Sequence, residues 1–255
     1  MRASAVLFAT LACGCAGAPA GGELEGWAGY GPLQGFAQIP RAGSAGSTSS
    51  SRPTFKELGI KNAQLYDVEG RLGAANNAIF AGYRWLQPSG SAVLAQDLES
   101  EGDAFPQGTA TRTSDSVAFA RVGYERALTL GPRLTLAPDV GFLFFDFHVG
   151  TRGSGGESVS RGFSRGTLTA GLRLELRVSD LVALEGVAFA TPPLANLPVV
   201  YSLEGRLELR LLPFLEVFVG TGFDRYEIAD TERPLHNDVR LLVGPLVLGG
   251  LALEF

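Results

Sequence analysis

Apolar and polar residues alternate with a period of two through most of the chain, as β-strands require, because successive side chains point to opposite faces. The clearest example is 167–178, TLTAGLRLELRV, in which Leu, Ala and Val share one face, whereas Thr, Gly, Arg and Glu share the other. The segment 201–211, YSLEGRLELRL, repeats this pattern. Along 239–255 the alternation predicts one continuous apolar face that carries Val239, Leu241, Val243, Val247, Leu251, Leu253 and Phe255.

Ten segments of this kind are predicted as strands. They cover residues 23–39, 63–73, 78–87, 114–127, 134–149, 164–178, 181–190, 199–212, 215–227 and 238–255. Long and short connections alternate between them, and the longest lie at 40–62, 88–113 and 150–163. One end of the sheet therefore has tight turns and the other has large external loops, an asymmetry typical of membrane-spanning barrels. An even strand count returns both termini to the same end.

Alternation alone leaves open which face points outward. A soluble barrel or sandwich would turn its polar face to water. However, the apolar faces are almost purely aliphatic over whole strands, and the polar faces carry both charge signs. This favours hydrocarbon outside and charges inside. Because hydrocarbon cannot satisfy backbone polar groups, such a sheet must close. We therefore predict an all-β fold, a closed antiparallel up-and-down transmembrane β-barrel of about ten strands, with eight or twelve as alternatives.

The inward face then carries an ion-pair network, in which basic and acidic residues nearly balance. The network residues are predicted to be Asp67, Glu69, Arg71, Arg84, Arg121, Glu125, Arg173, Glu175, Arg177, Glu204, Arg206, Glu208, Arg210, Glu216 and Arg240. Further inward acids are Glu185 and Asp224. A small barrel has an interior that side chains can fill. We expect the network to stabilise the barrel and to leave at most a narrow polar path, with a selective pore as the alternative.

Aromatic residues near strand ends are expected to form girdles at the two membrane interfaces. They are Tyr83, Trp85, Phe145, Phe147, Tyr226 and Phe255.

Residues 1–20 have the composition of a secretory signal peptide: Arg2, an apolar run over 3–12, and Ala18-Pro19-Ala20 as an A-x-A cleavage site. The mature domain would be 21–255. LACGC, which contains Cys13 and Cys15, loosely resembles a lipid-attachment motif, so lipidation is left open. Cleavage after Ala20 would remove both cysteines of the chain, and with them any disulfide or thiol chemistry.

The remaining composition narrows the function. The length of 255 residues suits one barrel, and the net charge of −5 argues against nucleic acid as a partner. No phosphate-binding loop, dinucleotide motif or zinc-ligand cluster is found, so no cofactor, metal or catalytic residue is predicted. The acidic stretch 97–103 is expected to be solvated. A rim enzyme remains an alternative because His148 follows Asp146 and His236 adjoins Asn237.

One local motif falls in the first long loop. Thr54 and Glu57 have capping-box spacing, which predicts a short helix over 53–58.

Together the signal peptide, the loop alternation and the ending LVLGGLALEF resemble small bacterial outer-membrane β-barrel proteins of the OmpA/OmpW-like type. The resemblance covers 21–255 and implies a bacterial outer-membrane location, with outer-membrane lipid as a partner. It also implies that the C-terminal strand, ending at Phe255, is bound by the barrel-assembly machinery. The best-known small members resemble eight-stranded barrels, so ten strands depart from the pattern. A structural or surface-interaction role is expected, with the surface ligand unspecified. A small pore or transporter, and a rim protease or lipid-modifying enzyme, are the alternatives.

Overall fold

The computed structural model describes residues 20–38, 54–100, 103–194, 196–229 and 238–255, and all its regular elements are strands. Among these residues no helix is long and apolar enough to cross a membrane. Cys13, Cys15 and His236 lie outside the described residues. So does the predicted signal peptide, apart from Ala20, at which the first strand begins.

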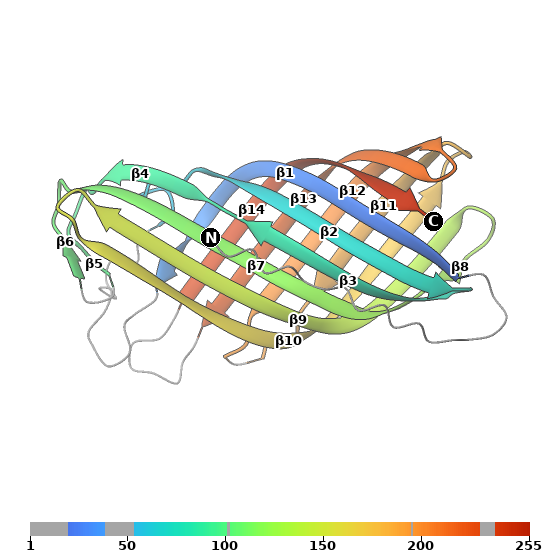
Figure 1. Cartoon of the computed structure of the whole chain (residues 1–255), viewed down its shortest axis with the longest axis horizontal. Helices are drawn as coiled ribbons and strands as arrows, with labels where there is room; N and C mark the ends of the chain where they lie inside the picture. The colour runs from blue at the N-terminus through green and yellow to red at the C-terminus, as the bar shows by residue number, and fades with distance from the viewer. Residues whose placement is uncertain (1–19, 39–53, 101–102, 195, 230–237) are drawn as a thin grey trace.

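Ten antiparallel strands form a closed barrel (Figure 1). They are β1 (Ala20–Gln38), β2 (Asn62–Ala74), β3 (Asn77–Leu86), β7 (Ala110–Arg126), β9 (Leu134–Gly153), β10 (Ser158–Arg177), β11 (Val182–Ala190), β12 (Val199–Leu212), β13 (Leu215–Ala229) and β14 (Asp238–Glu254). Each strand pairs with the next, and β14 pairs with β1 to close the sheet. The predicted fold class and strand number are confirmed.

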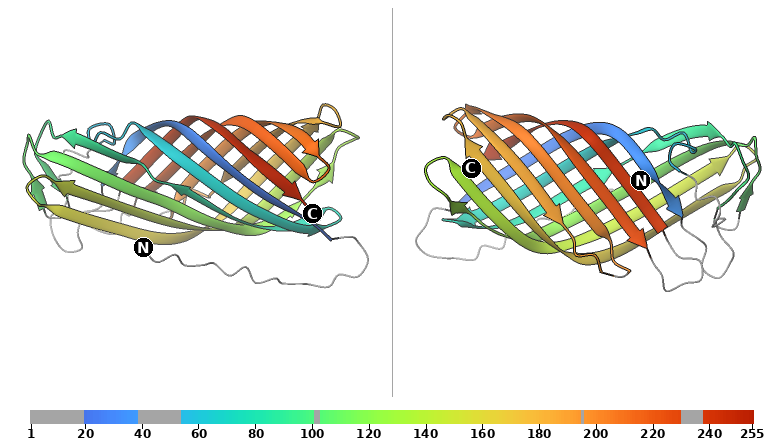
Figure 2. Two further views of the ribbon diagram at one scale, coloured as in Figure 1. Left: turned by 45° about the horizontal axis from the view of Figure 1, so that its top comes forward. Right: turned by 180° about the vertical axis from the view of Figure 1, so that it is seen from behind.

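Four short strands lie at the ends of the barrel. At the loop end, β4 (Ser89–Val93) pairs with β7 beyond the end of β3, and β5 (Leu98–Ser100) forms a hairpin with β6 (Asp103–Phe105). At the turn end, β8 (Leu128–Thr129) pairs with β9. Figure 2 shows β5 and β6 at the end of the barrel opposite to the C-terminus. The loop end therefore carries additional structure that covers the barrel.

Besides 88–113, which contains β4, β5 and β6, two predicted connections differ from the structure. The hairpin between β9 and β10 is shorter than the predicted loop 150–163, because both strands continue to Gly153 and from Ser158. In the first loop the capping box is formed: the Glu57 amide donates to Thr54 Oγ1 at 3.2 Å, and the Thr54 amide donates to Glu57 Oε2 at 2.8 Å. It encloses a turn rather than the predicted helix, since Ile60 N–H already donates back to the Phe55 carbonyl at 2.8 Å.

The aliphatic faces point outward, as the alternation predicts. Leu172, Leu207 and Leu251 are 41%, 48% and 47% exposed, whereas the alternate residue Arg206 is 5% exposed. Tyr83 and Trp85 also face outward, and their rings lie 5.6 Å apart. A continuous apolar exterior of this kind is stable in hydrocarbon and unfavourable in water. The exterior therefore fits a lipid bilayer.

The last strand departs from its predicted pattern. Val243 is buried and inward, whereas Val247 is 76% exposed, so the apolar residues of 239–255 do not share one face. The register of β14 with both neighbours is interrupted between these residues. Gly244 lies there with φ of 138°, and a Cβ on it would approach the Gly222 carbonyl oxygen to 3.0 Å. This bulge shifts the alternation by one residue, as bulges do.

A charge on the lipid-facing side of β12 gives a depth-dependent test of this orientation. Leu207, near the middle of the strand, should destabilise the barrel by about 2–4 kcal/mol when replaced by Arg, because a charge at the bilayer midplane is poorly solvated. The matched variant Leu211→Arg, near the turn end, should cost about 0–1 kcal/mol. The measurement is urea unfolding in phosphatidylcholine vesicles. Equal and negligible effects at both positions would contradict the membrane placement.

Candidate functional site in the barrel interior

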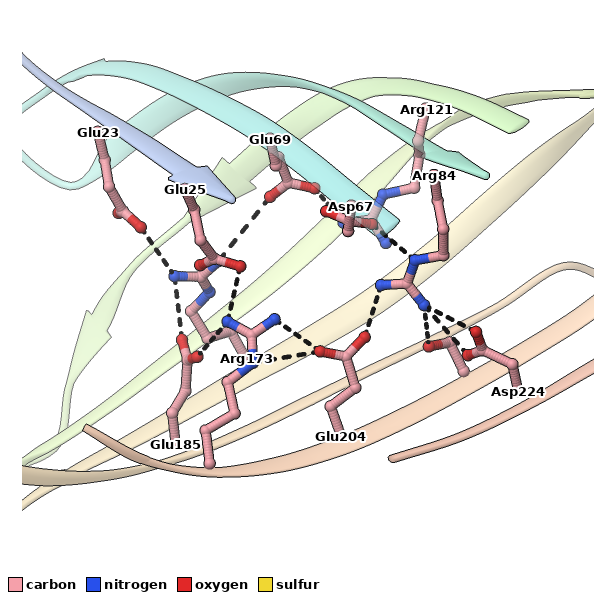
Figure 3. A network of polar contacts seen from close by, with 12 residues as sticks. Glu23, Glu25, Asp67, Glu69, Arg84, Arg121, Arg173, Glu185, Glu204 and Asp224 are labelled. Carbon is pink, nitrogen blue, oxygen red and sulfur yellow. Dashed lines mark hydrogen bonds and ion pairs between the residues drawn. The ribbon is translucent and has the colours of Figure 1, made fainter. Parts of the chain in front are cut away.

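Five arginines and nine carboxylates form one connected ion-pair network across the middle of the barrel. Figure 3 shows most of these residues. Its residues are Glu23, Glu25, Asp67, Glu69, Arg71, Arg84, Arg121, Glu125, Asp139, Arg173, Glu185, Glu204, Arg206 and Asp224. They come from every barrel strand from β1 to β13, because period two places alternate residues of each strand inside. The network therefore joins opposite walls.

Arg84 is the hub at the loop side of this network. Its guanidinium bonds to Asp67 at 2.6 Å, to Glu204 at 2.5 Å and to Asp224 at 3.1 Å. A further donor reaches the Ser202 hydroxyl at 2.9 Å. Arginine presents five N–H donors in a rigid fork, so a single side chain can connect several strands. Arg84 thus ties β2, β3, β12 and β13 together across the lumen.

Arg206 connects the first hub to the turn side. Its guanidinium lies 2.7 Å from Glu25, 3.1 Å from Glu185 and 2.6 Å from Glu204. Beyond it, Arg71 contacts Glu23 at 2.8 Å, and Arg173 contacts Glu185 at 3.0 Å. Successive arginines therefore share carboxylates.

Aromatic rings fill the space between these charged groups. The Arg84 guanidinium carbon lies 4.8 Å from the centre of the Trp27 ring, and that of Arg121 lies 4.5 Å from the centre of the Phe189 ring. Such contacts are favourable because the ring face is electron-rich. A cavity of about 20 Å³ remains among the charged groups, which is room for about one water molecule. The lumen is thus filled at this level.

Several predicted network residues lie instead at the turn-end mouth, where a cavity of about 290 Å³ opens. These residues are Glu175, Arg177, Glu208, Arg210 and Glu216. The Arg177 side chain is 55% exposed and bonds to Glu175 at 2.6 Å. Arg210 bonds to Glu216 through Nε at 2.6 Å. Water reaches this part of the predicted network, so its pairs are weaker than the buried ones. Phe255, the predicted assembly residue, is 73% exposed at the same end.

Arg240 was predicted in the lumen but lies on the outer wall. Its side chain is 55% exposed and bonds to Glu227 of the neighbouring strand at 2.7 Å. The cause is the bulge at Gly244, because it inverts the two faces of β14 on its loop side. The prediction carried the alternation through this point unchanged.

Sequence reasoning missed Glu23, Glu25 and Asp139. The first two are spaced by two residues on β1 and precede the buried Trp27, which is the pattern of an inward strand face. That signal was available. Asp139 follows a proline within β9, and nothing in the local sequence separates it from a turn residue. Carboxylates consequently outnumber arginines in the central network, whereas near balance was predicted.

Toward the loop end the interior changes from charged to mostly apolar. Along β2 the inward residues next to Asp67 on its loop-end side are Leu65 and Ala63, which are 0% and 2% exposed. Phe145, Phe147 and Tyr226, predicted as girdle aromatics, also point inward here and are buried. Phe145 and Tyr226 have ring centres 6.3 Å apart. The girdle prediction is wrong for these three residues, which pack in a core instead.

Residues from the first two long loops complete this core, which we call the apolar plug. They are Phe55, Leu58, Ile60, Leu94, Leu98 and Phe105. Phe55, Ile60 and Phe105 are fully buried. Folding these loops inward removes apolar surface from water, which is worth about 25 cal/mol per Å². The plug therefore lies on the loop side of the ion-pair network.

Polar groups of the outer wall lie near the same end. The His148 Nε2 atom is 2.8 Å from the Ser160 hydroxyl oxygen, and the Ser164 hydroxyl donates to Asp146 at 2.5 Å. A catalytic triad requires the carboxylate to orient the imidazole. Here Asp146 is bonded to a serine. Among the described residues, no group of three or more potential metal ligands is found.

Comparisons with known proteins give matches of low similarity. No family model matches the sequence, and no curated protein matches it. The outer membrane protease OmpT from Escherichia coli is 13% identical over 91% of this chain and 97% of its own, with a TM-score of 0.49. The attachment invasion locus protein Ail of Yersinia pestis is 12% identical over 92% of this chain and 99% of its own, with a TM-score of 0.36. OprG from Pseudomonas aeruginosa is 8% identical over 93% of this chain and 96% of its own, with a TM-score of 0.37.

The predicted transmembrane-barrel architecture is confirmed by the closed sheet and its apolar exterior.

Removal of the Arg84 hub should strongly destabilise the barrel. We expect Arg84→Met to cost about 3–5 kcal/mol, because Asp67 and Asp224 would be left as buried carboxylates without a cation and Glu204 would keep only Arg206. The control is Arg177→Met at the exposed mouth, which should cost less than about 1 kcal/mol. Denaturant unfolding of both refolded variants measures the difference. Equal costs would contradict a central role for the buried hub.

Asp115 gives a pH-dependent prediction. It points inward from the part of β7 that extends toward the loop end, beyond the apolar exterior, and it is 2% exposed. No described residue hydrogen-bonds its carboxyl oxygens. Burial raises the pKa of Asp115 to about 8. Because its pKa in the unfolded chain is about 4, ionisation opposes folding, and this penalty grows as pH rises from about 4 to about 8.

Asp115→Asn should therefore unfold at higher denaturant than the parent at pH 8.5, by on the order of 1 kcal/mol or more. At pH 4 the two proteins should differ little. A stability gain of equal size at both pH values would rule out ionisation as the cause.

Proposed function

We propose that this protein is a closed barrel of a bacterial outer membrane, with a structural or surface-interaction role carried by its external end. The observation that supports this best is that the lumen is filled at two successive levels. Charged side chains bond across its middle, and the apolar plug lies above them. Each layer by itself would obstruct a solute.

A pore is less well supported. Cavities of about 450 and 290 Å³ open at the turn end, and their linings include Arg71 and Glu208. Further toward the loop end, at the level of the ion-pair network, only a cavity of about 20 Å³ remains. A continuous path would require both the arginine hubs and the buried loop residues to move. Such a rearrangement breaks buried ion pairs and exposes apolar surface, and both are costly.

The proposal is also non-enzymatic. His148 and Ser160 form a hydrogen-bonded pair, but among the described residues no carboxylate bonds to the imidazole. Without such a partner the imidazole lacks the orientation that serine hydrolases use.

Conductance recording tests the closed lumen. The refolded chain, inserted into planar phosphatidylcholine bilayers, should give no steady single-channel steps. Arg84→Ala, which disrupts the network, should stay silent because the plug remains. The variant Phe55→Ser with Phe105→Ser should also stay silent because the network remains.

Insertion must be verified separately by heat-modifiable gel migration and by protection from protease in vesicles. Steady conductance steps from inserted parent protein would overturn the closed-lumen proposal. Steps from one single-layer variant would show that the other layer does not close the lumen by itself.

A further inference from the structure

The outer wall formed by β4, β7, β9 and β10 changes character along its length. Near the turn end its outward rows are apolar: Val122, Phe142 and Leu168 lie side by side in the register. The next row contains Phe144, which is 57% exposed. Beyond it these strands continue toward the loop end (Figure 1), and the outward residues become polar, beginning with Asp146 and Ser164. This extension stands outside the apolar exterior.

Two arginines face each other on this extension. Arg112 of β7 and Arg152 of β9 are direct register partners, flanked by Ser91 of β4 and Ser158 of β10. Both arginines are exposed on the outer wall. Like charges directly opposite one another destabilise a sheet. Among the side chains that the structure describes, which do not include those of Glu99 and Asp103, neither arginine has a carboxylate within salt-bridge distance.

The other exposed arginines of the outer wall at this end differ in this respect. Arg225 and Arg240, on β13 and β14, both bond to Glu227 at 2.7 Å. Their charge is partly neutralised within the protein. Among the described side chains nothing neutralises the Arg112–Arg152 pair, and two guanidinium groups side by side favour an anion held between them.

The next row of outward residues, on the side of the arginines that faces the apolar exterior, consists of small residues. It consists of Ser89, Ser114, Gly150 and Ser160, which are register neighbours across the four strands. Serine hydroxyls donate and accept hydrogen bonds, and glycine lets a ligand approach the backbone. A shallow, hydroxyl-lined surface beneath two cations suits an anionic saccharide better than an apolar partner.

The height of the arginine pair indicates which saccharide. Eight residues separate Phe144 from Arg152 along β9. At about 3.3 Å per residue and a strand tilt of about 40°, Arg152 stands about 20 Å beyond the apolar exterior. A phospholipid headgroup layer is about 5–8 Å thick, so a simple phosphate headgroup would not reach it. An extended headgroup is required.

We infer that this wall binds the anionic saccharide headgroup of an outer-leaflet glycolipid. Arg112 and Arg152 hold a phosphate or carboxylate of the saccharide, the serine and glycine row lies against its sugar rings, and the acyl chains pack on Phe144 and Leu168. The continuity of the polar wall with the apolar exterior favours a lipid over a free glycan, because one amphipathic molecule covers both. The inference does not depend on whether the lumen is closed.

Lipid binding by the full chain in phosphatidylcholine nanodiscs tests this. The probe is a lipopolysaccharide truncated after its phosphate- and carboxylate-bearing inner core, and native mass spectrometry measures its retention. Arg112→Gln with Arg152→Gln should raise the dissociation constant about tenfold. Arg225→Gln with Arg240→Gln removes the same charge from the opposite wall and should change it less than about twofold.

Two further probes separate the alternatives. Lipid A alone, without the core saccharide, should bind both double variants like the parent, since it does not reach the arginine pair. The deacylated core saccharide should bind the parent much more weakly than the intact glycolipid. If the deacylated saccharide binds as tightly as the intact glycolipid, the ligand is a free glycan and the lipid assignment is wrong. If the Arg112→Gln, Arg152→Gln variant binds the intact glycolipid as tightly as the parent, the arginine pair is not the binding site. Heat-modifiable migration verifies that each variant is folded.

Discussion

Hydrocarbon offers no hydrogen-bond partner to a peptide group, and this constraint determines the rest of the molecule. Every strand that crosses the apolar exterior must pair on both sides, so the sheet has to close. The closing pair is β1 with β14, and its register runs from Glu23–Glu254 to Gln38–Asp238 with one interruption. Once the sheet is closed, each residue faces either lipid or lumen. The chemistry of the two faces is then fixed by alternation, and every side chain on the inner face must be accommodated in a narrow interior.

Inward side chains are buried in two different ways, by apolar packing and by ion pairing. The connections at the two ends of the barrel determine which of the two applies. At the loop end, long connections fold back over the lumen and supply Phe55, Leu94 and Phe105 as apolar cover. Many inward residues there are aliphatic or aromatic because they are shielded from water, although Thr113 and Asp115 are buried among them. At the turn end the connections are short, and Arg177 and Arg210 remain accessible to solvent. Inward residues between these regions are charged and must pair with one another, since neither water nor an apolar neighbour can satisfy them.

Much of this arrangement follows from the sequence because period two is a strong signal in long strands. The ten strands, the distribution of loops and the aliphatic exterior could be predicted from patterns such as TLTAGLRLELRV. The prediction from this alternation was wrong where one extra residue interrupts it: the bulge at Gly244 places Arg240 on the outer wall. The plug could not be predicted either, because an apolar residue such as Phe147 alternates identically whether it meets lipid or a loop. Which of the two it meets depends on how residues more than forty positions away fold.

The buried arginines raise a separate physical question, because ion pairs in a low-dielectric interior gain little net stability over apolar residues of similar size. Their contribution in this barrel is to the specificity of strand register. A strand whose two faces were both apolar could slip by one residue, and it would then exchange its lipid-facing and lumen-facing sides at little cost. With Glu204 and Arg206 on one face and Leu203 and Leu207 on the other, the same slip would place two charges in hydrocarbon. The arginine alone costs about 2–4 kcal/mol near the bilayer midplane, and the glutamate adds a smaller cost. The charged lumen therefore defines which register is native, and the same register places Arg112 opposite Arg152 at the external end.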